Sequence, residues 1–212
     1  MIQKTILFVK KPPGPTSHDI VDEVRRITGE KRVGHAGTLD PFAQGLLIVL
    51  VGREATKRQS EFMKLDKEYI ATLHLGAESN TGDLTGTISS TRASEINLEP
   101  IGKALQKFVG EISQVPPEFS AIKINGKKAY ELARAGKEVK LEARKIKIYG
   151  IEVINYKWPS LELKINCSSG TYIRALARDI GRELECGAYL EKLVRTKIGE
   201  YKLENAINLS QI

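Results

Sequence analysis

The chain has 212 residues, and its 41% hydrophobic content is enough to bury the core of one domain or of two small ones. It contains no run near the ~20 apolar residues of a membrane span and begins without the apolar segment of a secretory signal, so we expect a soluble cytoplasmic protein. Lys plus Arg number 33 against 26 Asp plus Glu, a net charge of +7, which favours RNA or DNA as partner, although a lysine-rich solvated surface has the same balance.

The N-terminal part predicts a strand, a break and a helix. Residues 6–9 are apolar, and residues 10–15 contain three prolines and a glycine, which prevent regular structure. Thr16 or Ser17 then caps a helix. The apolar face of this helix comprises Ile20, Val21, Val24 and Ile27.

A glycine-containing segment, residues 34–41, follows a basic turn at 29–32. It reads Gly-His-Ala-Gly-Thr-Leu-Asp-Pro. Because Pro41 disfavours a helical backbone at Asp40, this carboxylate should lie on a loop. The apolar run 46–52 predicts a strand buried on both faces. Asp40 is therefore either a catalytic group on a loop that the core holds in place, or a turn residue that caps a backbone amide.

The middle of the chain predicts alternating elements. We expect a helix at 54–65 and a strand at 67–76 that begins near Tyr69. The polar segment 78–86 either binds a ligand or connects two strands. A second amphipathic helix spans 98–109, a strand spans 119–124, and Asn125-Gly126 predicts a tight turn.

Residues 127–145 form a basic segment with an aromatic residue, Tyr130. The basic residues are Lys127, Lys128, Arg134, Lys137, Lys140, Arg144 and Lys145. Such a segment, about 125–145, fits an arm that grips RNA, but a solvated helix has the same pattern.

The C-terminal part predicts two strands, 145–157 and 161–169, and then a helix opened by residues 168–171 that ends near Gly187. A short apolar segment at 189–194 and a last strand at 198–203 follow. Without repeats or linkers, the pattern indicates one continuous α+β domain.

Cysteines and histidines are few. Cys167 and Cys186 lack metal-ligand spacing, and His18, His35 and His74 do not complete a zinc set with them. We therefore expect neither a disulfide nor a metal.

Several segments resemble, in order, the TruB family of tRNA pseudouridine synthases. They are residues 11–14, 34–57, 66–69 and 169–174, with further likeness at 119–123, 186–188 and 193–195. The resemblance covers nearly the whole chain. It implies the pseudouridine synthase fold, a mixed and largely antiparallel sheet flanked by helices and loops, over a single catalytic domain of residues 1–212.

The resemblance implies isomerisation of uridine 55 in the T loop of tRNA, without a cofactor. Uracil must leave the ribose at N1, turn, and rejoin through C5. By this likeness Asp40 supplies the essential carboxylate, as a nucleophile or as a base. Arg174 is then its ion-pair partner, which keeps it ionised when buried; on general grounds a phosphate contact is the alternative for Arg174.

The same likeness assigns the pocket. Tyr69 stacks on the flipped uracil and assists proton removal from C5. His35 fills the gap left in the RNA; by pattern alone it is a turn histidine bonded to backbone. Tyr172 and Leu193 line the pocket, although both also fit an ordinary core.

Phosphate contacts are assigned to Lys57, Lys123 and Arg195. The expected partner is the T arm of tRNA, bound by a monomer that needs no protein partner and no membrane.

Two features depart from the family pattern. Phe119 stands where tyrosine is common, and the chain stops at Ile212, where relatives usually continue into a PUA-type domain. Two other functions remain open: a guide-RNA-dependent synthase, and a non-catalytic tRNA-binding or folding module on the same scaffold.

Overall fold

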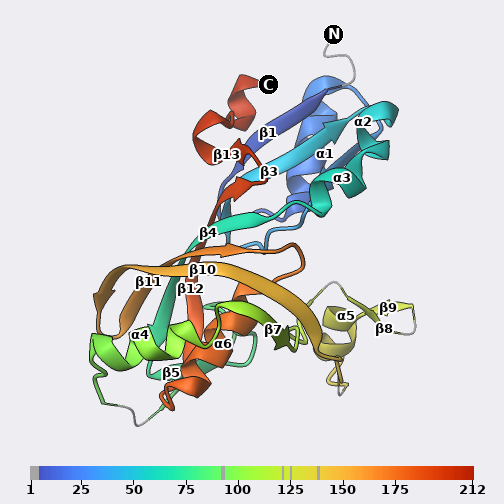
Figure 1. The fold of residues 1–212 in the computed structure, drawn as a ribbon. Coiled ribbons are helices and arrows are strands. Elements are labelled where there is room, and N and C mark those ends of the chain that lie inside the picture. Colours follow the sequence, from blue (N-terminus) through green and yellow to red (C-terminus); the bar gives the residue numbers. More distant parts are fainter. Residues whose placement is uncertain (1–4, 92–93, 121, 125, 138) are drawn as a thin grey trace. The chain divides into compact units, whose positions relative to one another are not determined.

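The computed structural model describes residues 5–91, 94–120, 122–124, 126–137 and 139–212 (Figure 1). The predicted turn residue Asn125 and Ala121 of the predicted strand 119–124 lie outside these ranges. Among the described residues, no helix is long and apolar enough to cross a membrane.

A mixed sheet is the main element of the fold. Its strands follow the order β1-β3-β12-β4-β11-β10-β7, with β2 beside β3 and β13 beside β12. β3 runs parallel to β12 and antiparallel to both β1 and β2, and β10 runs antiparallel to β7. The predicted α+β class with a mixed, largely antiparallel sheet is confirmed. The bounds are β1 (Ile6–Lys11), β2 (Val33–Ala36), β3 (Gln44–Val51), β4 (Lys67–Leu75), β7 (Gly110–Gln114), β10 (Arg144–Lys157), β11 (Ser160–Cys167), β12 (Ala188–Ile198) and β13 (Tyr201–Lys202).

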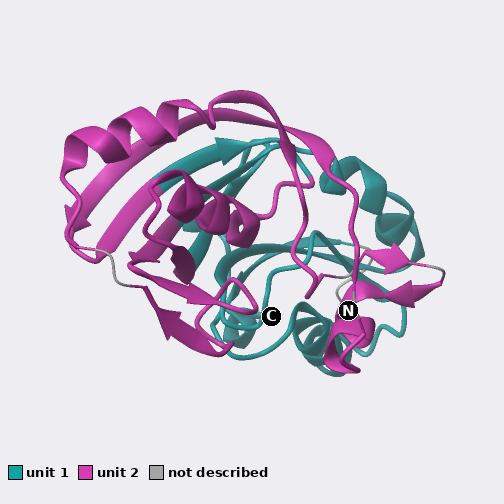
Figure 2. Cartoon of the chain, turned by 90° about the horizontal axis from the view of Figure 1, so that it is seen from below, with its two compact units in different colours: residues 1–70, 164–169, 192–212 teal, residues 71–163, 170–191 magenta. Residues whose placement is uncertain are grey.

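The chain divides into two compact units, each made of segments that are separate in sequence (Figure 2). The first unit comprises residues 1–70, 164–169 and 192–212. The second unit comprises residues 71–163 and 170–191.

The first unit is built on β3, whose residues 45–51 are all buried, as the apolar run predicts. On one face Leu47, Val49 and Val51 pack with the apolar stripe of α1 (Ser17–Thr28). On the other face Leu46, Ile48 and Leu50 form a second cluster that includes Phe62 and Ile198. Burial of each such side chain contributes about 1.5–3 kcal/mol, so both faces of β3 stabilise this unit.

The start of α1 follows the sequence closely. Thr16 is the N-cap residue: its hydroxyl accepts from the Asp19 amide at 3.1 Å, and the Asp19 carboxylate accepts from the Thr16 amide at 2.7 Å. This reciprocal capping box satisfies two amides that the helix leaves unpaired. The same contact lowers the pKa of Asp19, because backbone and side-chain hydrogen bonds from Thr16 favour its charged form.

Three local predictions for the first unit are wrong. β1 continues to Lys11, because residues 6–11 pair in register with β3. Residues 33–36 form β2 instead of loop, again by pairing with β3. The predicted helix 54–65 is two short helices, α2 (Arg53–Lys57) and α3 (Gln59–Met63). They separate at Arg58, whose amide bonds three residues back to Ala55 and so tightens the turn.

In the second unit, α4 (Leu98–Gln106) contacts both α6 (Ile173–Glu183) and β10 (Figure 1). The apolar residues of α6 are buried, but the helix begins two residues after Thr171, with Tyr172 as N-cap residue. The predicted loop 78–86 connects the strands of a hairpin, β5 (Ala77–Ser79) and β6 (Ile88–Ser90).

The predicted strand 119–124 is wrong except at its end. Among the described residues of this segment, only Lys123–Ile124 (β8) is strand, in a hairpin with Lys127–Lys128 (β9) that precedes α5 (Ala129–Arg134). The carbonyls of Phe119 and Ser120 accept instead from the Arg174 guanidinium and the Tyr130 amide, so they are not available to a ladder. The segment 189–194 and the start of the predicted strand 198–203 belong to the long strand β12.

Candidate active site

Asp40 lies on a loop, residues 37–43, that joins β2 to β3 in the first unit. The Ala43 amide donates to the Asp40 carbonyl at 3.1 Å, a turn with Pro41 at its second position. Ser17, at the start of α1, bonds the loop in both directions: its hydroxyl donates to the Leu39 carbonyl at 3.1 Å and accepts from the Leu39 amide at 2.9 Å. The predicted loop position of Asp40 is confirmed.

A buried lysine holds the loop after Asp40. The Lys11 ammonium donates to the carbonyls of Pro41 at 3.1 Å and Ala43 at 2.7 Å, and to that of Pro12 at 3.0 Å. The Gly14 amide also donates to the Pro41 carbonyl, at 2.8 Å. Lys11 is 1% exposed. The Lys-Pro-Pro-Gly segment therefore fixes the backbone on which Asp40 is mounted.

A buried arginine holds the loop before Asp40. The Arg195 guanidinium, on β12, donates to the carbonyls of Gly37, Thr38 and Leu46. Arg195 is 1% exposed. This position differs from the one expected for a phosphate contact, because the guanidinium lies inside the first unit and is bonded to backbone.

Two buried lysines of the first unit, Lys11 and Lys67, have perturbed pKa values. Burial lowers the pKa of Lys11 to about 8, although the nearby charge of Asp40 acts in the opposite direction. Burial and the charge of Arg195 also lower the pKa of Lys67 to about 8. The Lys67 ammonium donates to the carbonyls of Met63 and Leu65, so it closes the end of α3. Of these two lysines, Lys11 bonds to the Asp40 loop, whereas Lys67 bonds outside it and lies near Arg195.

Tyr69 and Leu193 are buried side chains of the same unit, on β4 and β12. Burial raises the pKa of the Tyr69 hydroxyl, the charge of Arg195 counteracts part of this rise, and the charge of Asp40 adds to it. Tyr69 therefore lies within the electrostatic reach of both Asp40 and Arg195, as a neutral phenol.

His35, on β2, is partly buried. Burial, and then the charge of Arg195, lower the pKa of its imidazole, which favours the neutral ring. Its Nδ1 atom is buried and has no hydrogen-bond partner among the described residues. The His35 carbonyl accepts from the Gln59 side chain at 2.7 Å, which ties β2 to α3.

Arg174 lies in the first turn of α6 in the second unit and is 6% exposed. Its guanidinium donates to the carbonyls of Thr81 at 3.0 Å and Phe119 at 2.9 Å, and lies 3.5 Å from the Asp83 carboxylate. Asp83 is itself buried, and its other oxygen accepts from Thr85. Arg174 is thus rigidly positioned by its own unit.

Tyr172 precedes Arg174 and is fixed through its backbone. The Gln114 side chain donates to the Tyr172 carbonyl at 3.1 Å and accepts from its amide at 2.9 Å. Phe119 contributes a carbonyl to Arg174, and this contact is independent of the hydroxyl that a tyrosine would bring to position 119.

The two lysines predicted to contact phosphate are exposed. Lys57, on α2, pairs with Glu54 at 2.9 Å, and Lys123 lies on β8. In the basic segment, Tyr130 on α5 has Lys128 and Arg134 against its ring, with 5.4 Å and 5.6 Å to the ring centroid.

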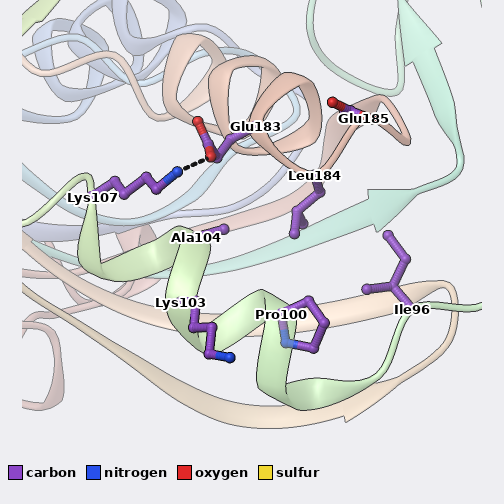
Figure 3. Close-up of a pocket in the computed structure, with 8 residues that line it drawn as sticks. All are labelled: Ile96, Pro100, Lys103, Ala104, Lys107, Glu183, Leu184 and Glu185. Atoms are coloured by element: carbon purple, nitrogen blue, oxygen red, sulfur yellow. Dashed lines mark hydrogen bonds and ion pairs between the residues drawn. The ribbon is translucent and has the colours of Figure 1, made fainter.

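A pocket of about 350 Å³ lies in the second unit between α4 and the end of α6 (Figure 3). Its walls include Pro100, Lys103 and Leu184, and an ion pair of 2.5 Å joins Lys107 and Glu183 at its edge. It contains none of the predicted site residues, since Arg174 lies at the opposite end of α6.

Sequence reasoning missed the roles of Lys11, Asp83 and Gln114. Lys11 could have been found, because strand alternation puts it on the same face as buried Val9. The contacts of Asp83 with Arg174 and of Gln114 with Tyr172 carry no local signal, since these partners lie far away in the sequence.

Comparison with known proteins gives one family. Residues 25–173 match the model of the N-terminal domain of TruB family pseudouridylate synthases, and residues 174–212 match that of the tRNA pseudouridylate synthase B C-terminal domain. The protein named tRNA pseudouridine synthase B from Protochlamydia amoebophila is 46% identical over 207 residues, 98% of this chain and 79% of that protein. Its namesake from Phocaeicola vulgatus is also 46% identical, over 96% of this chain and 89% of the relative.

Solved structures give the same fold. A chain in the crystal structure of a Cbf5-Nop10-Gar1 complex matches with a TM-score of 0.75 and 30% identity. The match covers 97% of this chain and 52% of the other, so the present chain spans about half the length of that relative.

Proposed function

The chain belongs to the TruB family of pseudouridylate synthases and is a tRNA pseudouridine synthase, and we propose that its target is uridine 55 in the T loop of tRNA. Support comes from relatives at 46% identity over nearly the whole chain. The observation that carries the proposal is the Asp40 loop, which Lys11 and Arg195 hold by its carbonyls on either side of the carboxylate.

The reaction moves one glycosidic bond. The C1′–N1 bond of uridine breaks, uracil turns, and a C1′–C5 bond forms; a proton leaves C5 and N1 gains one. We propose that Asp40 is the essential carboxylate, as a nucleophile or as a base, and that Arg174 is its ion-pair partner. A carboxylate and a guanidinium on rigid supports suit this chemistry, because small misplacements of catalytic groups reduce rates strongly.

The target base must leave its stack, at a cost of a few kcal/mol. We propose that Tyr69 stacks on the extruded uracil with Tyr172 and Leu193 around it, and that the neutral ring of His35 occupies the gap in the T loop. The exposed Lys57 and Lys123 would contact phosphates, and the basic arm, about 125–145, would grip the T arm.

The organisation we propose is a single catalytic domain comprising both units, active as a monomer in the cytoplasm on tRNA alone. A guide-RNA-dependent synthase would instead need a guide and partner proteins. Relatives at 46% identity named tRNA pseudouridine synthase B favour a synthase that acts on tRNA alone over a guide-RNA-dependent one.

The test is incubation of the purified protein with an unmodified tRNA transcript, followed by chemical mapping of pseudouridine. We expect one modified position, uridine 55, without guide RNA or added protein. Binding without any pseudouridine would favour the non-catalytic module, and a product at another position would refute the proposed target. A transcript with cytidine at position 55 is the matched control.

Two substitutions of Tyr69 separate stacking from hydroxyl chemistry. Tyr69→Phe keeps the ring, so affinity for tRNA should stay unchanged while turnover falls. Tyr69→Ala also loses stacking, worth roughly 1–3 kcal/mol per base, so affinity should fall by about 5- to 150-fold. Dissociation constants from filter binding and single-turnover rates check this; equal affinities of the two variants would refute the stacking role.

The pKa of Lys11 predicts an alkaline limb in the pH profile. The turnover number should fall as pH rises through about 8, because Lys11 loses its charge beside Asp40 and one of its donors to the loop. Between pH 8 and 10.5 the folded state binds fewer protons at Lys11 than the unfolded state, so this group makes folding more favourable as pH rises. A fall in activity over this pH range should therefore not come from a loss of protein stability caused by the titration of Lys11.

The measurement is kcat against pH with the melting temperature at each pH. Lys11→Met should be slower and should lack this limb. Lys67→Met is the matched control, because Lys67 has a similar pKa but bonds to carbonyls of residues 63 and 65 outside the loop. If Lys11→Met kept the limb, another group would be responsible for it.

A further inference from the structure

We propose that Arg195 is a positioning residue for pseudouridine synthesis, which fixes the backbone on the N-terminal side of Asp40 and makes no contact with RNA phosphate. The inference rests on the proposed function, since its readout is turnover of tRNA. The carbonyl contacts of Arg195 indicate this role in place of the phosphate contact expected from the sequence.

The contacts of Arg195 use the shape of its side chain as well as its charge. Nε donates to the Leu46 carbonyl at 2.8 Å, Nη2 to the Gly37 carbonyl at 3.0 Å and Nη1 to the Thr38 carbonyl at 3.4 Å. One planar group thus joins the start of β3 to the start of the loop. Lysine has the same charge on a single nitrogen, whereas here each of the three acceptors is met by a different nitrogen of one planar group, and lysine does not reproduce that geometry.

Two glycines let the chain approach Arg195 closely. Gly45 has φ +117°, and a Cβ atom there would lie 2.4 Å from the Arg195 carbonyl oxygen, because β3 and β12 pair at this point. Gly37 has φ +94°, and its Cβ would lie 3.5 Å from Arg195 Nη1. These positive φ values favour glycine. Gly45 therefore permits the close pairing of β3 with the Arg195 backbone, and Gly37 gives the start of the loop the conformation in which its carbonyl meets the guanidinium.

Arg195 bonds to loop residues other than those that Lys11, Gly14 and Ser17 hold. Lys11, Gly14 and Ser17 bond to residues 39, 41 and 43, whereas the hydrogen bonds that the described residues make to the carbonyls of residues 37 and 38 come from Arg195. Without the guanidinium, residues 37–38 would lose these donors while the bonds to residues 39, 41 and 43 stayed in place. The backbone leading to Asp40 would then be held at Leu39 but could shift at residues 37–38, and a misplacement of Asp40 near 1 Å can cost about 10²-fold in rate.

The test compares Arg195→Lys with Arg26→Lys, the same change at an exposed arginine of α1 that pairs with Glu23. We expect Arg195→Lys to lower kcat by about 10- to 100-fold, with tRNA affinity unchanged. The slope of log affinity against log salt should also stay unchanged, whereas loss of a phosphate contact would reduce it by about 0.7–0.9. Arg26→Lys should match the parent in kcat. Faster amide hydrogen exchange in residues 37–43 of Arg195→Lys is a readout independent of activity.

A second variant covers the case in which Arg195→Lys does not fold. Gly37→Ala strains the loop backbone at φ +94°, where the Gly37 carbonyl accepts from Arg195, and should lower kcat at unchanged salt slope. Gly29→Ala, at φ +69° with no atom within 4 Å of the added Cβ, carries similar backbone strain away from the loop and should keep kcat.

Three results would overturn the proposal: a reduced salt slope with normal kcat in Arg195→Lys, parental behaviour of Arg195→Lys in every measurement, or equal kcat for the two glycine variants. If the parent protein itself made no pseudouridine, the proposed function would fail instead. The faster exchange in residues 37–43 would still report whether Arg195 fixes the loop.

Discussion

Replacing Asp40 by asparagine is expected to lower kcat for tRNA by about 10³-fold or more, while affinity for tRNA stays within about twofold of the parent. The substitution keeps the shape of the side chain and removes its charge, and an amide is neither a useful nucleophile nor a base. The loop should remain in place, because its hydrogen bonds to Lys11, Ser17 and Arg195 involve backbone groups of residues 37–43.

The measurement is single-turnover formation of pseudouridine together with a binding constant for the same transcript. Asp22→Asn, the same change at an exposed carboxylate of α1, is the matched control and should match the parent. Turnover of Asp40→Asn within about tenfold of the parent would remove Asp40 from the mechanism. In the parent, a slower reaction with deuterium at C2′ of the target ribose would favour the base over the nucleophile.

The loop that carries Asp40 was predictable because its signals are local. Pro41 excludes a helical backbone at Asp40, and the apolar run after it forms β3 with residues 45–51 buried. The N-cap of α1 at Thr16 was predictable for the same reason. Such features depend on neighbours within a few residues, and these are visible in one sequence.

Pairing between distant segments was not predictable. β2 contains Gly34 and lacks an alternating pattern, and it is a strand because β3 provides its partners. The segment 119–124 has a strand-like composition, but the carbonyl of Phe119 accepts from Arg174, 55 residues away. Tertiary contacts decide both cases, and strand propensity is weak enough for such contacts to override it.

The candidate site likewise contains residues that the sequence indicated and residues that it did not. Residue types such as Asp40, Tyr69 and Arg174 were selected through the resemblance, whereas the groups that hold them were missed. Arg195 illustrates this: an arginine in a basic chain suggests a phosphate contact, and only its burial and its three carbonyl partners show that it holds backbone.

Removing the Arg174 charge is the second change with a large expected effect. Arg174→Met should lower kcat by about 10²–10³-fold, as loss of a preorganised charge does. It should also lower the free energy of unfolding by about 3 kcal/mol, because it leaves the buried Asp83 carboxylate without its cation. Both effects follow from one substitution, so the variant alone does not separate catalysis from stability.

A double-mutant cycle with Asp83→Asn makes the separation. Asp83→Asn removes the charge but keeps an oxygen that accepts from Thr85, so the double variant has no unpaired charge at this position and should recover part of the lost stability. If Arg174 pairs with Asp40, the double variant should remain as slow as Arg174→Met. Recovery of kcat in parallel with the free energy of unfolding would show that Arg174 only stabilises its own unit, and the ion pair with Asp40 would then be wrong.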